Sequence, residues 1–193
     1  MVAARTGSSG LLVCYATRDG QSRRIAERIA AQLVEGGPSV IPYDLSVAPP
    51  PPAELERCRL VVLVMAVRYG RHLPVADRFF ATHRALLARA RLVLISVSLT
   101  ARKPGKDSVE GNRYLQKSIA RHGLKPDLAA AVAGRLDYQR YGWLDRQIIR
   151  LIMKMTGGPT DPQSSVEFTQ WAVVDKLASR IADLHETLQA AAG

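Results

Sequence analysis

Hydroxyl and glycine residues connect an apolar run to a helical pattern near the start of the chain. After Leu11–Tyr15 comes the segment Thr17-Arg18-Asp19-Gly20-Gln21-Ser22. The first backbone N–H groups of a helix lack intrahelical partners and carry the positive end of the helix dipole, so they attract phosphate. Thr17 and Ser22 add hydroxyl groups, and Gly20 permits a positive φ. The segment predicts either a phosphate site or an ordinary turn in which Asp19 or Ser22 caps the helix.

A second segment, Arg68-Tyr69-Gly70-Arg71-His72, carries an aromatic ring, a glycine and two arginines. The ring of Tyr69 can stack on a planar ligand, while Arg68 or Arg71 can pair with a phosphate or carboxylate. His72 can move protons near neutral pH. In the alternative interpretation Tyr69 covers the edge of the sheet, the arginines are solvated and His72 takes no part in chemistry.

A third segment, Ser98–Ser108, is long and basic, with Arg102, Lys103 and Lys106 within it. Loops of this length in a compact domain are usually functional or mobile. Three cations at the mouth of a crevice would favour a ligand that carries carboxylates. A basic loop that is simply solvated fits the same residues.

Apolar, β-rich runs alternate with helical patterns, which predicts a parallel sheet covered by helices on both faces. The runs are Leu11–Tyr15, Leu60–Met65, Leu92–Val97 and Ala129–Ala133, with a shorter candidate at Ser39–Tyr43. The helical patterns are Gln21–Glu35, Pro74–Arg89, about Gly111–His122 and Ser164–Leu188. Pro49–Pro52 are interpreted as an extended surface link, because proline continues neither a helix nor a central strand.

These elements predict a flavodoxin-like three-layer α/β sandwich with five parallel strands in the order 2-1-3-4-5. Ligands of such sheets bind beyond the carboxyl ends of the strands, so the three segments above should meet at one edge. A chain of 193 residues is long enough for one domain with a substantial core. We predict an N-terminal extension over residues 1–9, a single domain over 10–190, and an insert over about 136–158.

The second half of the insert has an amphipathic helical pattern. Apolar residues recur at helical spacing from Leu144 to Met155, and cations recur every four residues on another side. Aromatic residues precede the pattern, and the combination is typical of a helix that lies in a membrane interface. The predicted membrane contacts are Trp143, Arg146, Ile148, Arg150, Leu151, Ile152, Lys154 and Met155. Alternatively, this helix packs on its own domain or on a second subunit, as in a homo-oligomer.

The composition restricts the partners and the compartment. Lysine and arginine number 27 against 17 acidic residues, and the net charge of +10 should attract an anionic partner such as a membrane surface. Nucleic acid is disfavoured, because no aromatic platform, zinc-finger spacing or ribonucleoprotein motif accompanies the charge. The spacing of Cys14 and Cys58 indicates no disulfide, metal site or redox motif. Residues 1–10 lack the apolar core of a signal peptide, and no apolar run approaches the ~20 residues of a membrane span.

Four segments in chain order resemble the bacterial flavodoxin-like, menaquinone-dependent protoporphyrinogen oxidase family. They are Thr17-Arg18-Asp19-Gly20-Gln21, Arg68-Tyr69-Gly70, Ala101-Arg102-Lys103-Pro104, and Arg150-Leu151-Ile152-Met153-Lys154-Met155 followed by Gly157-Gly158. The resemblance runs from about Leu11 to Ala182. Many flavodoxins share the first segment, whereas the other three are more specific to this family.

The resemblance implies non-covalently bound FMN, oxidation of protoporphyrinogen IX to protoporphyrin IX in haem synthesis, and electron transfer to a respiratory quinone. It places the protein in the cytoplasm, at the inner face of the cell membrane. The implied FMN contacts are Thr17, Arg18, Asp19, Gly20, Gln21 and Ser22 at the phosphate, Arg68, Tyr69 and Gly70 beside the ring, and Ser98, Leu99 and Thr100 over its other side. Arg102, Lys103 and Lys106 suit the propionates of the porphyrin. Flavin carries the redox chemistry, so no acid–base pair is required, and neither such a pair nor a metal site is evident.

Two other functions remain open from the sequence. One is a flavodoxin-like electron carrier, or another quinone-reducing flavoprotein. Typical flavodoxins use acidic surfaces to meet basic partners, so the net charge of +10 argues against the carrier role. The other is a flavin-free interaction module whose amphipathic helix docks a partner.

Overall fold

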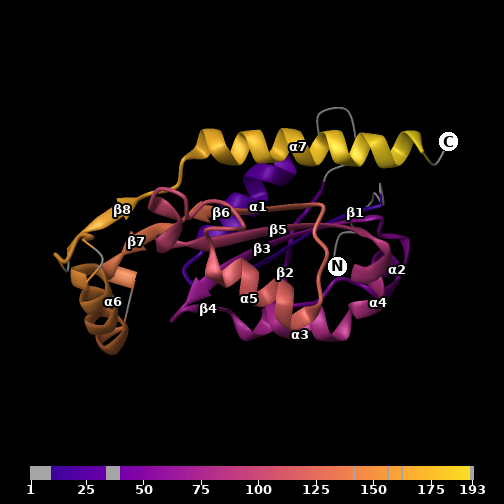
Figure 1. Cartoon of the computed structure of the whole chain (residues 1–193). Helices are drawn as coiled ribbons and strands as arrows, with labels where there is room; N and C mark the ends of the chain where they lie inside the picture. The colour runs from indigo at the N-terminus through magenta and orange to yellow at the C-terminus, as the bar shows by residue number, and fades with distance from the viewer. Residues whose placement is uncertain (1–9, 34–39, 141, 156, 162, 192–193) are drawn as a thin grey trace, which may run out of the picture.

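A computed structural model describes residues 10–33, 40–140, 142–155, 157–161 and 163–191. Figure 1 shows a central sheet between two layers of helices, with α1 and α7 on one face and α2 to α5 on the other. The strands are β1 (Leu11–Ala16), β2 (Tyr43–Asp44), β3 (Leu60–Arg68), β4 (Arg71–His72), β5 (Arg91–Ser98), β6 (Leu128–Ala133), β7 (Arg135–Asp137) and β8 (Ser165–Glu167). The helices are α1 (Gln21–Gln32), α2 (Pro52–Arg57), α3 (Pro74–Thr82), α4 (Arg84–Arg89), α5 (Arg113–His122), α6 (Trp143–Met155) and α7 (Trp171–Ala190). Short 3₁₀ turns cover Leu99–Arg102 and Tyr138–Arg140.

The main sheet has the predicted topology. Its five parallel strands lie in the order β2-β1-β3-β5-β6, which is 2-1-3-4-5 when only the parallel strands are numbered, so the prediction is confirmed. The hairpin strand β4 adds an antiparallel pair at the end of β3. A separate two-stranded sheet joins β7 to β8. All the parallel strands therefore end at one edge, where their connecting loops meet.

The central strand β3 is buried on both faces because its side chains alternate between two apolar layers. Val61 and Leu63 face the layer that contains Phe80 of α3. Val62 and Val64 face the layer that contains Ile25 of α1 and Ile181 of α7. This explains why the sequence of the strand is continuously apolar and not alternating.

Two of the predicted helices differ from the structure. The pattern Pro74–Arg89 forms two helices, α3 and α4, with a break at His83, whose φ of −108° and ψ of 31° are not helical. The apolar spacing continues across this break, so periodicity could not reveal it. The pattern Ser164–Leu188 was predicted as one helix, but Ser165–Glu167 pair with β7 and α7 begins at Trp171. A tertiary pairing thus overrides the local helical preference.

The short second strand and the proline run also differ. The strand predicted at Ser39–Tyr43 covers Tyr43–Asp44, and Ser39 lies outside the described residues. Helix α1 is described to Gln32 and its C-cap Leu33, so the end predicted at Glu35 lies outside as well. Pro52 is not part of an extended link but opens α2. Proline is tolerated there because the first helical N–H has no intrahelical acceptor.

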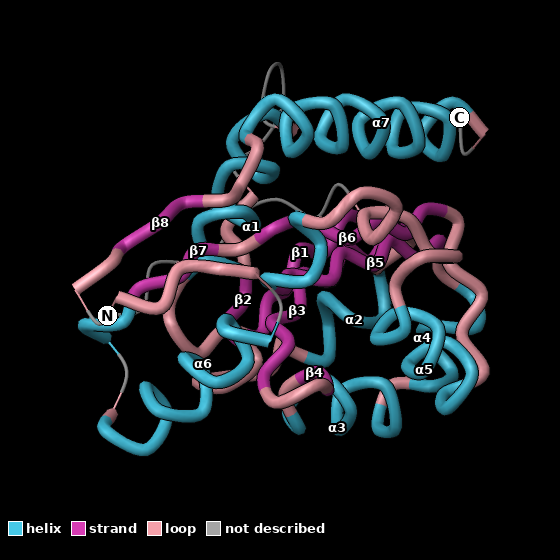
Figure 2. Tube along the Cα trace, turned by 60° about the vertical axis from the view of Figure 1, so that its left-hand side comes forward, coloured by secondary structure: helices cyan, strands magenta, loops and turns pink. Residues whose placement is uncertain are grey.

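Beyond the carboxyl edge of the main sheet, β7, β8 and α6 lie together, as Figure 2 shows. Leu136, Tyr138 and Met153 form their small buried core. Helix α6 ends in a Schellman motif, in which Gly157 has a φ of +66° and the N–H of Gly158 donates to the carbonyl of Met153 at 2.8 Å. A Cβ on Gly158 would lie 2.5 Å from the sulfur of Met153 and 2.9 Å from the guanidinium of Arg102, so these two side chains would have to shift to admit a larger residue.

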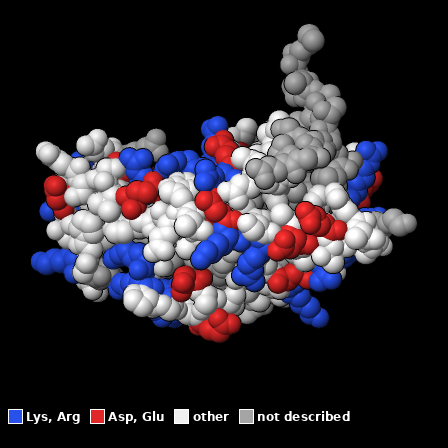
Figure 3. Space-filling view, turned by 90° about the horizontal axis from the view of Figure 1, so that it is seen from above, with Lys and Arg blue, Asp and Glu red and all other residues white. Residues whose placement is uncertain are grey.

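The face covered by α7 has mixed charge, as Figure 3 shows. Arg28 of α1 pairs with Asp175 of α7 at 2.8 Å, and Arg24 pairs with Glu167 at 2.7 Å. The first pair joins α1 to α7 and the second joins α1 to β8, although each exposed pair is expected to stabilise the fold only slightly. The basic excess of the chain therefore produces no uniformly positive surface on this face.

Burial of His72 should make stability depend on pH. Burial lowers the pKa of His72 from 6.5 to about 4, with nearby Asp77 partly opposing the shift, and the ring shares a 2.9 Å hydrogen bond with Ser96. As the pH falls from 6.5 to 4, the unfolded chain binds a proton that the folded chain does not, so the unfolding free energy should fall by about 3 kcal/mol. Urea denaturation should show this loss in the protein that carries His72. In the variant His72→Gln the unfolding free energy should depend less on pH. Equal slopes in both proteins would contradict this role of His72.

Candidate functional site

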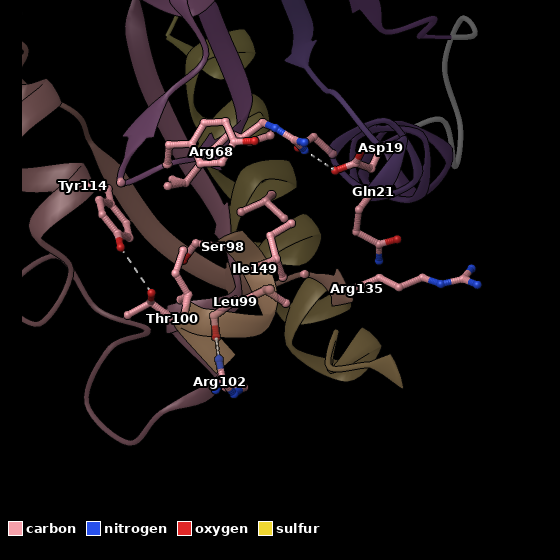
Figure 4. Close-up of a pocket in the computed structure, with 18 of the residues that line it drawn as sticks. Asp19, Gln21, Arg68, Ser98, Leu99, Thr100, Arg102, Tyr114, Arg135 and Ile149 are labelled. Carbon is pink, nitrogen blue, oxygen red and sulfur yellow. Dashed lines mark hydrogen bonds and ion pairs between the residues drawn. The ribbon is translucent and has the colours of Figure 1, made fainter. Parts of the chain in front are cut away.

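A cavity of about 210 Å³ lies at the carboxyl edge of the sheet, and the ends of β1, β3, β5 and β6 and one side of α6 form its walls. Figure 4 shows how these segments converge. Ten of the predicted cofactor residues line it: Thr17, Asp19, Gln21, Ser22, Arg68, Tyr69, Gly70, Ser98, Leu99 and Thr100. Arg18 and Gly20 are not among the described residues that line it. The three segments that the sequence singled out thus meet at one place.

The turn before α1 leaves the start of the helix open. Gly20 is the N-cap residue, with a φ of 89°, and its N–H donates to Thr17 Oγ1 at 3.0 Å. Within the described residues no side chain caps α1, so the interpretation of Asp19 or Ser22 as a cap is wrong. The next backbone N–H groups point past the helix end and are available to an anion.

Two buried hydroxyl groups face this cavity without a partner. Within the part of the chain that the structure describes, the Oγ atoms of Ser22 and Ser98 neither donate nor accept a hydrogen bond. Both serines are buried and both line the cavity. Since buried polar atoms in proteins are normally hydrogen-bonded, these two atoms indicate that a polar ligand belongs here.

The hairpin between β3 and β4 presents an aromatic ring at the rim. Tyr69 and Gly70 are the two central turn residues, with φ values of 49° and 77°, and Arg68 pairs with Arg71 across the turn. Positive φ at both positions defines a type I′ turn, which matches the twist of the strands but strains a tyrosine. The Arg68 guanidinium lies over the Tyr69 ring at 5.1 Å.

Helix α6 is tied to this hairpin through Asp145. Arg68 donates to Asp145 and also to Asp19, the latter at 3.2 Å, while the Tyr69 hydroxyl donates to Asp145. The hydrogen bond from Tyr69, together with Arg68, lowers the pKa of the Asp145 carboxyl. Asp145 was not predicted from the sequence, although it is the one acidic residue of the otherwise basic segment Trp143–Met155.

Gln21 has a structural role that the sequence did not indicate. Its side-chain amide donates to Glu167 at 2.6 Å and to Thr169 at 2.8 Å, and Thr169 donates to the carbonyl of Ala133 at 2.7 Å. The Gln21 side chain therefore fixes the start of α1 to β8 and to the end of β6.

Cations occupy another part of the rim. Arg102 and Lys103 line the cavity, as does Arg135, which the sequence analysis did not select, whereas Lys106 is not among the described lining residues. Arg102 donates to the carbonyl of Leu99 at 2.7 Å, and Arg135 pairs with Asp137 at 3.0 Å. The position of Arg135 just after the predicted fifth strand could have indicated it.

Two further residues complete the comparison with the predicted site. Tyr114 lines the cavity from α5 and shares a 3.3 Å hydrogen bond with Thr100, a contact that no local pattern predicts. His72, in contrast, is buried beside Ser96 and is not among the described residues around the cavity. We therefore assign it no proton-transfer role.

One side of α6 forms an apolar wall of the cavity, through Ile149, Ile152 and Met153. Large apolar side chains on its opposite side are exposed: Trp143, Leu144, Ile148, Leu151 and Met155, with Ile152 at the boundary. Two of the predicted membrane cations instead hold nearby backbone, since Arg146 donates to the carbonyl of Tyr138 and Arg150 to that of Thr160. Lys154 is exposed.

Comparison with known proteins places the chain in a family. A family model for the flavodoxin domain matches residues 12–163. The chain is 37% identical over 173 residues to a protein of Escherichia coli strain K12 named protoporphyrinogen IX dehydrogenase [quinone]. This alignment covers 90% of this chain and 94% of that relative. A Leishmania major protein of the same name is 33% identical, with 90% of this chain and 74% of the relative covered. The chain belongs to the flavodoxin-like protoporphyrinogen IX dehydrogenase family.

The solved structure of an archaeal flavodoxin confirms the fold of this family member. It aligns with a TM-score of 0.51 at 12% identity and covers 91% of this chain and 98% of the flavodoxin chain. Flavodoxin domains bind flavin, and the residues present fit such a cofactor. The open start of α1 suits an anionic group, the unpartnered hydroxyls of Ser22 and Ser98 suit polar atoms, and Tyr69 suits a planar ring.

The hydroxyl of Ser22 should contribute to flavin affinity through the phosphate. We expect Ser22→Ala to weaken binding of flavin mononucleotide about tenfold, because a hydrogen bond to a charged group contributes about 1.5 kcal/mol. Binding of riboflavin, which lacks the phosphate, should change less than about twofold. Titration of cofactor-free protein, followed by flavin fluorescence, measures both affinities.

Ser118→Ala provides the matched control, because Ser118 is also a buried serine with an unpartnered hydroxyl among the described residues, but it lies on α5 and outside the cavity lining. It should leave both affinities unchanged. Equal losses in the two variants, or an unchanged affinity of Ser22→Ala for flavin mononucleotide, would show that Ser22 does not face the phosphate.

Proposed function

We propose that this protein oxidises protoporphyrinogen IX to protoporphyrin IX with bound FMN and passes the electrons to a membrane quinone. One observation carries the proposal: a single cavity is walled both by the turn at the uncapped start of α1 and by the apolar side of α6, whose far side is exposed. The identity of 37% with a dehydrogenase of that name, over nearly the whole of both chains, supports the substrate and the acceptor.

FMN fits the turn better than a flavin without phosphate. Residues Thr17–Ser22 leave one helix N-terminus open, and no acidic residue lies in the first turn of α1 to repel a phosphate. The hydroxyl of Ser22 can donate to the same group. Asp19 is turned toward Arg68, at 3.2 Å, which neutralises its charge at this position.

Bound flavin supplies the redox chemistry by accepting hydrogen from the substrate and releasing electrons to the acceptor. The chain itself orients the reactants and excludes water. Arg68, which precedes Tyr69, lies at one side of the cavity, and the turn from Ser98 to Thr100 lies at the other. Ile149 and Met153 make the intervening wall apolar. Formation of one protoporphyrin removes six electrons and six protons, so three quinones are needed, and each leaves the site as the quinol with two electrons and two protons.

The cations on the rim suit the substrate. Arg102, Lys103 and Arg135 line the same cavity, and guanidinium groups bind carboxylates in bidentate geometry. Protoporphyrinogen carries two propionates, so these side chains can hold its acidic edge while its macrocycle meets the apolar wall. Lys106 in the same loop adds positive charge at longer range.

We further propose that α6 binds the membrane surface. It is amphipathic, and among its described residues only Met153 is fully buried, while Leu151 and Met155 are strongly exposed. Such a helix, with the cation Lys154 beside its apolar face, is typical of interfacial binding to anionic lipid. None of the helices described by the structure is long and apolar enough to cross a bilayer. We propose the inner face of the cell membrane, reached from the cytoplasm, as the site of action.

Porphyrin fluorescence under argon tests the proposed reaction. Flavin-loaded protein with protoporphyrinogen and a naphthoquinone should produce porphyrin faster than a protein-free blank, and omission of the quinone should stop turnover. Arg102→Ala should raise the KM for protoporphyrinogen about tenfold, through loss of a charged hydrogen bond. The control Lys125→Ala removes a cation outside the cavity lining and should leave that KM unchanged. No gain over the blank with flavin bound would contradict the proposed function.

Sedimentation with anionic vesicles tests the membrane contact. Lys154→Glu should weaken binding about tenfold at low salt, because each cation near an anionic surface contributes about 1 kcal/mol. Leu151→Ser should weaken binding at both low and high salt, since the apolar contribution is not screened. Val47→Ser, at an exposed apolar residue outside α6, is the control. Equal sedimentation of all four proteins would exclude α6 as the membrane contact.

A further inference from the structure

We propose that α6 forms the access route for the isoprenoid tail of the quinone, and that Ile152 is the specificity-determining residue at its entrance. This inference rests on the proposed function for the identity of the acceptor. It assigns a binding surface for the tail that is separate from the cationic rim. The quinone ring would then enter the cavity from the side of α6.

The observation behind this proposal is a gradual change in exposure around α6. Leu144 and Leu151 are 67% and 61% exposed, Ile148 and Ile152 are 44% and 40% exposed, and Met153 is 1% exposed. Ile152 is the residue in this series that is both largely exposed and part of the cavity wall. A continuous apolar surface therefore runs from the outside of the helix into the cavity.

Helix geometry explains why the surface is continuous. Successive residues are rotated by about 100°, so Ile148 and Ile152, one turn apart, lie between the outward Leu151 and the inward Ile149 and Met153. If the outward side lies in a membrane interface, Ile152 sits between the acyl chains and the cavity. A tail that follows this surface does not have to leave an apolar environment.

The position of α6 is fixed relative to the hairpin that lies across the cavity. Asp145 accepts hydrogen bonds from both Arg68 and Tyr69, while Met153 is buried against Leu136 and Tyr138. The helix is thus held at its first turn and in its last turns. Ile152 projects between these two attachments, so the entrance has a defined position.

The chemistry of the two reactants separates their routes. A quinone is neutral and its tail is a hydrocarbon, so it gains from burial against isoleucine and gains nothing from a guanidinium group. The porphyrinogen carries carboxylates, which suit the rim formed by Arg102, Lys103 and Arg135. We infer that the acceptor enters along α6 and that the substrate enters over the cationic rim.

Reoxidation of chemically reduced, flavin-loaded protein tests this route without any porphyrinogen. The probes are a naphthoquinone with a four-unit isoprenoid tail and one with a methyl group in place of that tail, both in detergent. Ile152→Ser should slow reoxidation by the tailed quinone about tenfold at low concentration, and reoxidation by the tail-free quinone less than about twofold. Leu144→Ser, on the same helix but outside the cavity lining, should leave the ratio of the two rates as in the parent.

Protection of an introduced thiol provides a readout without electron transfer. Ile152→Cys and Leu144→Cys can be labelled with a maleimide, because the native Cys14 and Cys58 are buried and burial raises the pKa of both thiols. The tailed quinone should slow labelling at position 152 several-fold, and slow labelling at position 144 much less. The tail-free quinone, fully substituted so that it does not add to thiols, should protect neither.

The outcomes separate this inference from the proposed function. Equal slowing of both quinones by Ile152→Ser, or equal protection at positions 144 and 152, would overturn the tail route. Failure of both quinones to reoxidise the protein would overturn the proposed acceptor, and the labelling experiment would still decide whether the tail binds at Ile152. A protein that reoxidises with a tail preference but does not oxidise porphyrinogen would retain the route and lose the proposed substrate.

Discussion

Burial of the parallel sheet on both faces is the constraint on which the rest of the structure depends. Val61, Val62, Leu63 and Val64 are fully buried, so the middle of β3 offers no surface for a polar site. Polar groups must therefore collect where the strands end. Since the five strands of this sheet are parallel, their carboxyl ends meet at one edge, and the open start of α1, the Tyr69 hairpin and the turn after β5 surround one cavity.

Helix α6 is the element that a minimal sheet with covering helices does not require. It buries little of its own apolar surface, and its attachment relies on a small core around Tyr138, a Schellman motif at Gly157-Gly158, and the contacts of Asp145. A helix with this much exposed apolar surface usually marks an interaction site. Its position at the cavity connects the interaction surface directly to the site of chemistry.

Sequence reasoning predicted what depends on local periodicity and chain direction. The strand order and the meeting of three loops follow from apolar runs alternating with helical patterns, and both are found in the structure. It failed where a distant partner decides the conformation. Ser165–Glu167 form a strand because β7 lies beside them, and Gln21 turns to Glu167 and Thr169, which are more than a hundred residues away in the chain. Tyr114 reaches the cavity only through the packing of α5.

The central claim is that one cavity serves both a porphyrinogen and a quinone through bound flavin. Absorbance of the flavin-loaded protein under argon tests it most directly, with the two reactants added in turn. The account predicts that protoporphyrinogen bleaches the flavin band, and that an excess of naphthoquinone then restores it as porphyrin absorbance appears, with three quinones reduced for each porphyrin formed. A flavin band that protoporphyrinogen leaves unchanged would contradict the account, as would a bleached band that the quinone does not restore.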